Sequence, residues 1–531
     1  MTPSRRLDLP RQTLLGSLGL LAALLAILPL GGVVMAAVSG PGADIPLSEL
    51  LRYGATSATL ALLVGLVTAA TGTLAAWLIV MYRFPGHGFF SWGLALPLAA
   101  PGFALAYAYA DMLDPAGSLR VAMRAEWGMD WPFEIRSVGG AAFVLSMGFM
   151  PYVYLAMRAA FLHQSLAALE AARTLGCTAS QAFVRVALPM ARPALAAGTA
   201  LAVMETLADY GAVQFLAVQT LTTGVVRAWS VFGSPAGAAQ IALPLLVAAA
   251  FLLAAERKGR RGKSHDAARV RWQRLDAERL TGARGLLATL FCAALIGLGL
   301  VLPAGWLLRQ ALSHQADWAR LGEAATNSLG IAAVAALLTV TLALLLALGT
   351  ARNPLAARLA SLGYATPGAV MAIGLLAPAA IVWQYVPAGS SFALAIGLLL
   401  MAYAARLMAA ALEPVDAGLQ RFGPSLAAAS RTLGRSEAGT AWSVQLPLAR
   451  GALFTAGLIV FVDVLKELPA TLMLRPFDFD TLAVIANNYA LDERLGQAGW
   501  PSLLIIALAL PAVLWLSRQV AGSRPGAGAE P

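Results

Sequence analysis

The chain has 531 residues, of which 59% are hydrophobic and only 12% are charged, and its formal net charge is +10. A mean hydropathy of +0.73 excludes an ordinary soluble globular protein, because too little ionisable surface remains to face water. The basic residues lie in short connections between apolar runs, where they set membrane orientation, so we exclude nucleic acid as a partner. Composition therefore indicates an all-α integral membrane protein that contacts membrane lipid.

The first half of the chain contains six apolar runs, each long enough to cross a bilayer as a helix of about 20 residues. They lie near 14–38, 57–81, 89–112, 139–162, 193–216 and 236–255. The first run is longer than the apolar part of a signal peptide and further spans follow it, so we expect a retained helix. Arg5, Arg6 and Arg11 precede it, which predicts a cytoplasmic N-terminus.

The second half repeats this plan after a basic linker, and the whole chain is predicted to contain about twelve transmembrane helices. The further runs lie near 286–308, 328–348, 359–383, 392–412, 450–468 and 501–516. Arg518 and Arg524 follow the last run, so we expect the C-terminus to be cytoplasmic as well. The predicted division is a first half at 1–256, a cytoplasmic linker at 257–284, a second half at 285–519 and a disordered tail at 520–531.

A polar stretch that occurs once in each half is the most informative feature of the sequence. The shift of 258 positions that places Gly176 on Gly434 also places Pro189 on Pro447. Each glycine follows Ala-rich helical sequence and precedes an amphipathic stretch that ends in Leu-Pro. We therefore predict a helix, a glycine turn and a short second helix in each copy, and two related halves in the chain.

The spacing of this stretch resembles the EAA loop of ABC importer permeases. Residues 170–172 read Glu-Ala-Ala, and Gly176, Val186, Leu188 and Pro189 follow at the family's spacing. The strings KELPAT at 466–471 and LRPFDFDTLA at 474–483 resemble the fused permeases of ferric-iron importers. This resemblance covers nearly the whole chain. It implies the type I ABC importer permease fold, with two pseudo-twofold-related six-helix halves in a bacterial inner membrane.

The resemblance also implies partners on both sides of the membrane. In that family each loop docks on a separate ATP-hydrolysing subunit, and a periplasmic binding protein delivers the cargo. We accordingly expect two copies of an ATPase subunit that bind ATP and magnesium. The residues implied in docking are Glu170, Ala171, Ala172, Arg173, Gly176, Ala428, Arg431 and Gly434.

The two loops differ at one docking position, because Ala428 stands where the first copy has Glu170. The second docking surface is therefore expected to make weaker or different polar contacts. No nucleotide site is predicted within the chain itself. Gly262-Lys263-Ser264 lacks the glycine that a phosphate-binding loop requires at position 257. The chain is thus expected not to be an enzyme and to bind no cofactor.

Four acidic residues stand within the predicted spans that follow the two loops. Under the shift of 258 positions, Glu205 corresponds to Asp463 and Asp209 to Glu467. Charged side chains within a bilayer usually face a bundle interior or an aqueous path. One hypothesis is that these acids line a cation path. The other is that Lys466 and Arg227 pair with some of them as structural ion pairs near the outer membrane surface.

The sequence leaves one alternative open for the transported cargo and another for the class of transporter. Iron is the favoured cargo, but thiamine permeases share the fused plan, and polyamine, sulfate and molybdate permeases share the loop as half-sized chains. A secondary transporter driven by an ion gradient would explain the intramembrane acids but not two matched loops. The four histidines lie on different segments without ligand spacing, so no metal site is assigned.

Overall fold

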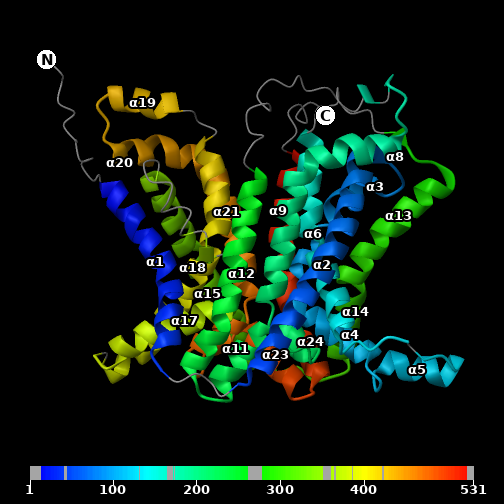
Figure 1. Ribbon diagram of the computed structural model, residues 1–531, viewed down its shortest axis with the longest axis horizontal. Coiled ribbons are helices and arrows are strands. Elements are labelled where there is room, and N and C mark those ends of the chain that lie inside the picture. The colour runs from blue at the N-terminus through cyan, green and yellow to red at the C-terminus, as the bar shows by residue number, and fades with distance from the viewer. Residues whose placement is uncertain are drawn as a thin grey trace.

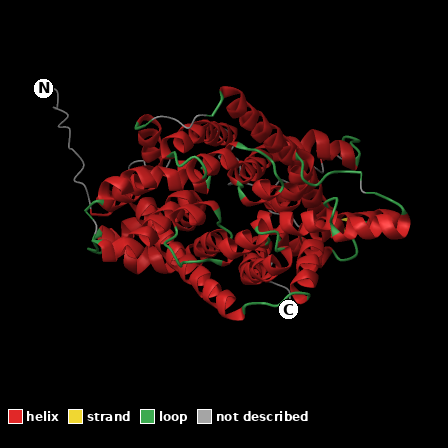
Figure 2. Cartoon of the chain, turned by 90° about the horizontal axis from the view of Figure 1, so that it is seen from below, coloured by secondary structure: helices red, strands yellow, loops and turns green. Residues whose placement is uncertain are grey.

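The computed structural model of the protein describes residues 14–40, 45–130, 132–163, 171–172, 174–260, 278–350, 360, 362–363, 366–385, 387–420 and 424–522. Helices dominate these residues, and a short strand pair is the sheet that they contain (Figure 2). Its strands β1 (Tyr82–Arg83) and β2 (Glu278–Arg279) run parallel. The segment that enters the second half is thereby tied to the first half.

The helices of the first half begin with the span that the sequence predicts at 14–38. In chain order they are α1 (Leu14–Val38), α2 (Leu47–Met81), α3 (His87–Gly93), η1 (Leu96–Ala99), α4 (Gly102–Leu113), α5 (Ser118–Trp127), α6 (Val138–His163), α8 (Ala179–Ala182), η2 (Phe183–Ala187), α9 (Leu188–Ala208), α10 (Gly211–Phe215), α11 (Leu221–Ser230) and α12 (Pro235–Arg260).

The second half repeats this order. Its helices are α13 (Gly282–Ile296), η4 (Gly297–Val301), α14 (Leu302–Leu312), α15 (Trp318–Thr350), α17 (Gly368–Trp383), η6 (Ala388–Ser390), α18 (Ser391–Gln420), α19 (Pro424–Thr432), α20 (Glu437–Thr440), η7 (Ala441–Gln445), α21 (Leu446–Leu465), α22 (Pro469–Leu474), α23 (Leu482–Leu491) and α24 (Leu495–Gly522).

Within the described ranges, 10 helices are long and apolar enough to cross a membrane, and up to 11 if one bent pair counts as a span. The difference from about twelve arises at the third span of each half. The predicted span at 89–112 is two helical segments bent by 90°, and the one at 359–383 contains the 16-residue helix α17. Both α4 and α17 begin directly after a proline, Pro101 or Pro367, which lacks the N–H donor that a continuous helix needs.

Two opposite faces of the helix bundle are distinguished in Figure 1. One face, called the loop face here, carries α8 and α20 at the top of the view, and the opposite face carries α5, α11 and α23. The helices α9 and α21 start beside α8 and α20 and run toward the opposite face. Residues near the ends of α9 and α21 therefore lie deep in the bundle, away from the loops.

The first long helix of each half packs against the other half. Helix α1 contacts α15, α17 and α18, while α13 and α14 contact α3 and α4. Glycines permit the closest approach, since a Cβ added to Gly32 would lie 1.7 Å from the carbonyl oxygen of Gly374. A similar crossing joins Gly19 to Gly349. Small residues that bring helix backbones together are the usual means of association in a bilayer.

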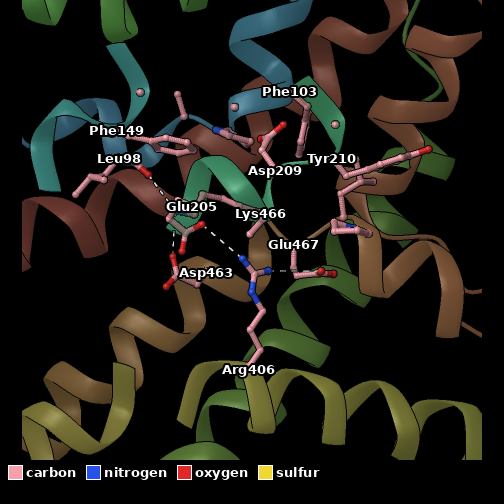
Figure 3. Close-up of a pocket in the computed structure, with 18 of the residues that line it drawn as sticks. Leu98, Phe103, Phe149, Glu205, Asp209, Tyr210, Arg406, Asp463, Lys466 and Glu467 are labelled. Atoms are coloured by element: carbon pink, nitrogen blue, oxygen red, sulfur yellow. Dashed lines mark hydrogen bonds and ion pairs between the residues drawn. The ribbon is translucent and has the colours of Figure 1, made fainter. Parts of the chain in front are cut away.

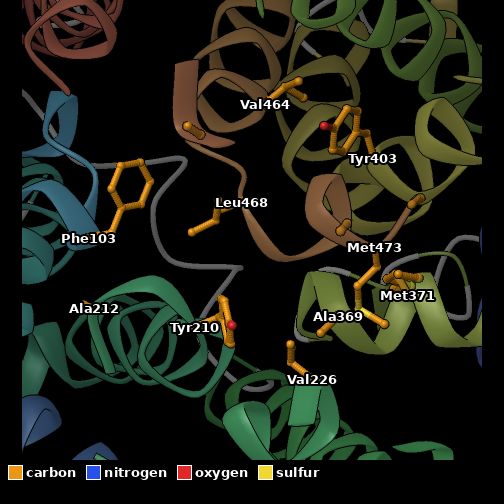
Figure 4. Close-up of a cluster of buried hydrophobic side chains, with 14 of the residues drawn as sticks. Phe103, Tyr210, Ala212, Val226, Ala369, Met371, Tyr403, Val464, Leu468 and Met473 are labelled. Carbon is orange, nitrogen blue, oxygen red and sulfur yellow. The ribbon is translucent and has the colours of Figure 1, made fainter. Parts of the chain in front are cut away.

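A shared hydrophobic core joins the halves between these crossings (Figure 4). Tyr210 and Leu468 are equivalent under the shift of 258 positions, and both are buried. Gly211 fits between Leu468 and Phe103, because an added Cβ there would lie 2.9 Å from Leu468 and 2.7 Å from Phe103. The interface between the halves is therefore continuous with the protein core.

Candidate functional site

The glycine turn predicted in each loop is confirmed. Gly176 has φ of 85° and Gly434 has φ of 83°, a left-handed conformation that side chains with a Cβ rarely adopt. The amide of Cys177 donates to Ala172 at 3.0 Å, and that of Arg435 donates to Ser430 at 3.3 Å. These bonds close the end of the preceding helix in the same way in both copies.

The short second helix of each loop continues into a π-helical segment. Helices α8 and α20 are followed by η2 and η7, which occupy equivalent positions under the shift of 258. The amide of Leu188 bonds to the carbonyl of Phe183, five residues back, and Leu446 bonds to Ala441 likewise. Pro189 and Pro447 stand in the first turn of the long helices and have no N–H to donate, which gives the Leu-Pro pair a structural reason.

The predicted docking residues are described in part. Ala171, Gly176, Ala428 and Gly434 are exposed on the loop face, whereas Ala172 is buried. Glu170 and Arg173 lie outside the described residues, and Arg431 belongs to α19 with its side chain outside the description. Two exposed leucines, Leu175 at 85% and Leu433 at 83%, occupy equivalent positions beside the turns and were not among the predicted docking residues.

The four predicted acids line one cavity between the two halves. Its volume is about 80 Å³, which is room for several water molecules. Its first-half walls are Leu98, residues 100–103, three residues of α6, and the end of α9 with the start of α10. Arg406 on α18, and Asp463 with residues 466–469 at the junction of α21 and α22, complete it. The sequence shift of 258 thus identified residues that the fold brings together.

Asp209 and Glu467 accept hydrogen bonds from the first turns of the helices that follow them. Asp209 accepts from the amides of Ala212 at 2.9 Å and Val213 at 3.2 Å. Glu467 accepts from the amides of Ala470 at 2.9 Å and Thr471 at 3.0 Å, and from the Thr471 hydroxyl at 2.7 Å. Both carboxylates therefore satisfy the free amides of a helix N-terminus, α10 or α22.

The same two acids also abut a second helix start in their own half. A Cβ added to Gly102, the first residue of α4, would lie 2.8 Å from Asp209. A Cβ added to Gly368, the first residue of α17, would lie 2.3 Å from Glu467. The positive ends of two helix dipoles therefore meet at each carboxylate. This capping role was not among the two hypotheses drawn from the sequence.

The other two acids, Glu205 and Asp463, lie beside basic side chains that also line the cavity (Figure 3). Lys466 lies 3.1 Å from Asp463, as the ion-pair hypothesis expects. Arg406 lies 3.5 Å from Glu205 and 3.6 Å from Glu467. The cavity thus contains four acids and two basic residues, an excess of two negative charges when all are ionised.

One expectation about basic residues was wrong, and two arginines within the predicted spans were overlooked. Arg227 does not pair with the cavity acids; it lies 3.6 Å from Glu49 and donates to Tyr53. Arg406 was overlooked, although an arginine inside the apolar run at 392–412 was a visible signal. Arg158 on α6 is likewise buried within a predicted span, where it donates to the Ser91 carbonyl at 2.5 Å.

The cavity does not present a metal-binding cluster. Among the described residues, no group of three or more histidine, cysteine, aspartate and glutamate side chains is arranged to hold a metal ion. Two of the four carboxylates are occupied by helix amides and the other two by cations.

The chain has two lobes, each with a glycine-turn loop on the same face, and both lobes contribute to the wall of one cavity. This arrangement is typical of a membrane transport permease. Residues 32–257 match the family of binding-protein-dependent transport system inner membrane components. The first half of the chain is therefore similar to this family, and the second half repeats the order of its helices. The predicted fused, two-lobed permease is confirmed as a multi-pass membrane protein.

Proteins similar to this chain fall into two groups by the share of the chain that they cover. The Fe(3+)-transport system permease protein FbpB 2 of Haemophilus influenzae is 24% identical over 82% of this chain and 83% of its own length. The sulfate transport system permease protein CysT of Escherichia coli is 29% identical over 40% of this chain and 78% of its own. The molybdenum transport system permease protein ModB of Escherichia coli is 30% identical over 27% of this chain and 60% of its own. All three are named as permeases, not as enzymes.

Proposed function

We propose that this protein is the membrane permease of an ABC importer that carries ferric iron. Iron is chosen because of the share of the chain that each relative matches. The iron permease of Haemophilus influenzae resembles both halves of this chain within one polypeptide. The sulfate and molybdenum permeases are similar to 40% of the chain or less. The cavity adds a physical reason, since an excess of carboxylates repels sulfate and molybdate and attracts a cation.

The two loops supply the mechanical input in this proposal. ATPase subunits, one on each loop, would approach each other when ATP binds and draw α8 and α20 together. The rigid helices α9 and α21 carry that movement into the bundle, because they begin where the loops end. Glu205 and Asp463 are each 17 residues beyond the start of their helix, or about 25 Å from the loop face. The loop face would then be cytoplasmic, with both termini on that side.

The cavity acids divide into two roles. Asp209 and Glu467 hold helix starts in place, so their oxygens are committed to protein amides. Glu205 and Asp463 point into the cavity beside cations, and we assign the cargo path to this second pair (Figure 3). A periplasmic binding protein would release its cargo near this pair from the face that carries α11 and α23.

Uptake by whole cells tests the proposal directly. Cells that lack this permease, with or without a plasmid copy, are given radiolabelled ferric iron, sulfate, molybdate or thiamine in turn. We expect the plasmid copy to restore iron uptake and to leave the other three unchanged. Restoration of thiamine uptake would assign the alternative organic cargo, and restoration of sulfate or molybdate uptake would overturn the argument from cavity charge.

The class of transporter needs a second measurement. In cells whose partner ATPase binds but cannot hydrolyse ATP, iron uptake through this permease is expected to stop. Uptake that continues under an imposed ion gradient would instead identify a secondary transporter. The loops would then have no energetic role, and the two outcomes exclude each other.

A further inference from the structure

Arg406 joins the two halves of the permease at the cavity. It stands on α18 of the second half, and its guanidinium lies 3.5 Å from Glu205 on α9 of the first half. The same group lies 3.6 Å from Glu467, beside α22 of its own half. Its side chain is 14% exposed, so water screens these contacts weakly. One planar group thus contacts a carboxylate from each half.

A second contact between the halves runs in the same direction. Lys466, also from the second half, donates to the carbonyl oxygen of Leu98 in the first half at 3.3 Å. Ala208 stands at the equivalent position in the first half, and the cavity residues of α6 are uncharged. Both cations of the cavity therefore belong to the second half and reach toward the first.

If Arg406 served only to pair with Glu467, it would not need to contact Glu205 as well. Glu467 already accepts from two amides and one hydroxyl of its own segment. What Arg406 adds is a link to the opposite half. Arginine suits this position, since its flat fork offers separate N–H groups to two acceptors, whereas a lysine would act as a single point charge.

We propose that Arg406 is a latch, a contact that holds the two halves together at the cavity, deep in the bundle. It must release Glu205 when the bundle opens at the end opposite the loop face. The inference rests on the proposed function as an alternating-access permease. Because the contact exists only while the halves are together there, it stabilises the closed arrangement against the open one. Weakening it shifts the population toward the open arrangement.

The separation of the two loops reports that shift without any partner. If two rigid halves pivot about their shared core, opening near the cavity brings the loop face together. Leu175 and Leu433 are exposed, equivalent positions on the two loops. Spin labels on Leu175→Cys and Leu433→Cys, with Cys177→Ser and Cys292→Ala removing the native thiols, give the distance distribution in lipid nanodiscs.

Glu205→Gln is the primary variant, because it breaks the link between halves and leaves Arg406 beside Glu467. We expect the ratio of short to long distances to rise about fivefold or more. Arg406→Gln should give the same shift, and the double variant should add nothing further, since both changes remove the same contact between the halves. Arg475→Gln is the matched control, which removes an ion pair of 2.6 Å with Asp480 inside the second half alone.

A distance distribution in Glu205→Gln that superimposes on the parent, or an equal shift in Arg475→Gln, would overturn the latch. Additive shifts in the double variant would also contradict it, since they would mean two independent effects. Cargo, ATPase and binding protein are absent from this measurement. A failed uptake assay would therefore refute the proposed function while leaving the measured distances, and the latch that they test, unaffected.

Discussion

The two halves of this permease share a plan but contribute unequally to the cavity between them. Each provides an acid that caps a short helix and an acid that faces the cavity. The second half alone adds Arg406 and Lys466. Its capping acid is also more enclosed, since the Glu467 side chain is 1% exposed. The two halves therefore share the backbone breaks and differ in the charges around them.

The two capping acids should differ most in their effect on stability. Glu467→Ala removes three hydrogen bonds and leaves Arg406 without one of its carboxylates, which we expect to cost about 3–5 kcal/mol. Asp209→Ala removes two backbone bonds, with an expected cost of about 1 kcal/mol. Thermal unfolding of the purified permease in detergent, followed by loss of the monodisperse peak, compares the two. Equal losses would show that the halves are equivalent at this point.

The crossing of α1 onto the second half offers a sharper contrast between neighbouring residues. Gly32→Ala places a methyl group against the carbonyl of Gly374, and overpacking of this kind costs about 1–3 kcal/mol. Gly31→Ala is the control, because nothing lies within 4 Å of its added Cβ. The same unfolding assay should show a lower midpoint for Gly32→Ala alone. An equal drop in Gly31→Ala would argue against the crossing as the cause, because alanine has a higher helix propensity than glycine and should not itself destabilise α1.

The loops test whether the inequality extends to the loop face. Glu170→Ala should lower iron uptake roughly tenfold, since a charge-assisted hydrogen bond to the ATPase contributes about 1.5–3 kcal/mol. Ala428→Glu, which restores the acid at the equivalent position, should leave uptake close to that of the parent. Uptake is measured at equal amounts of permease in the membrane. Equal losses in both variants would argue against unequal docking surfaces.

The architecture was accessible from the sequence because its signals are periodic and repeated. The predicted run at 14–38 coincides with α1, and the shift of 258 positions identified equivalent turns, proline positions and acids. Apolar length alone could not reveal that the third span of each half begins anew at Pro101 and Pro367. A hydropathy profile averages across such a break, whereas the backbone cannot continue through it.

The four acids of the cavity were predicted from the sequence, but the groups that they contact were mostly not. Glu205 and Asp463 were found by sequence equivalence, which points only to residues that occur in both halves. Arg406 has no charged equivalent among the cavity residues of α6, so the same comparison passed over it. The capping of α10 and α22 also escaped notice, because it depends on where α9 and α21 end. Contacts between distant segments required the fold.

The π-helical segments η2 and η7 set the rotation of the long helices α9 and α21 relative to the short loop helices α8 and α20. A helix that gains one residue within a turn turns its later residues by about 100° relative to its earlier ones. The face that α8 or α20 offers at the surface is therefore not the face that α9 or α21 turns inward. Deleting one residue from η2 would restore a regular helix and swing Glu205 away from Arg406 while leaving every loop residue in place. In the proposed mechanism, one extra residue in each half therefore determines the direction in which a movement of α8 or α20 reaches the cavity.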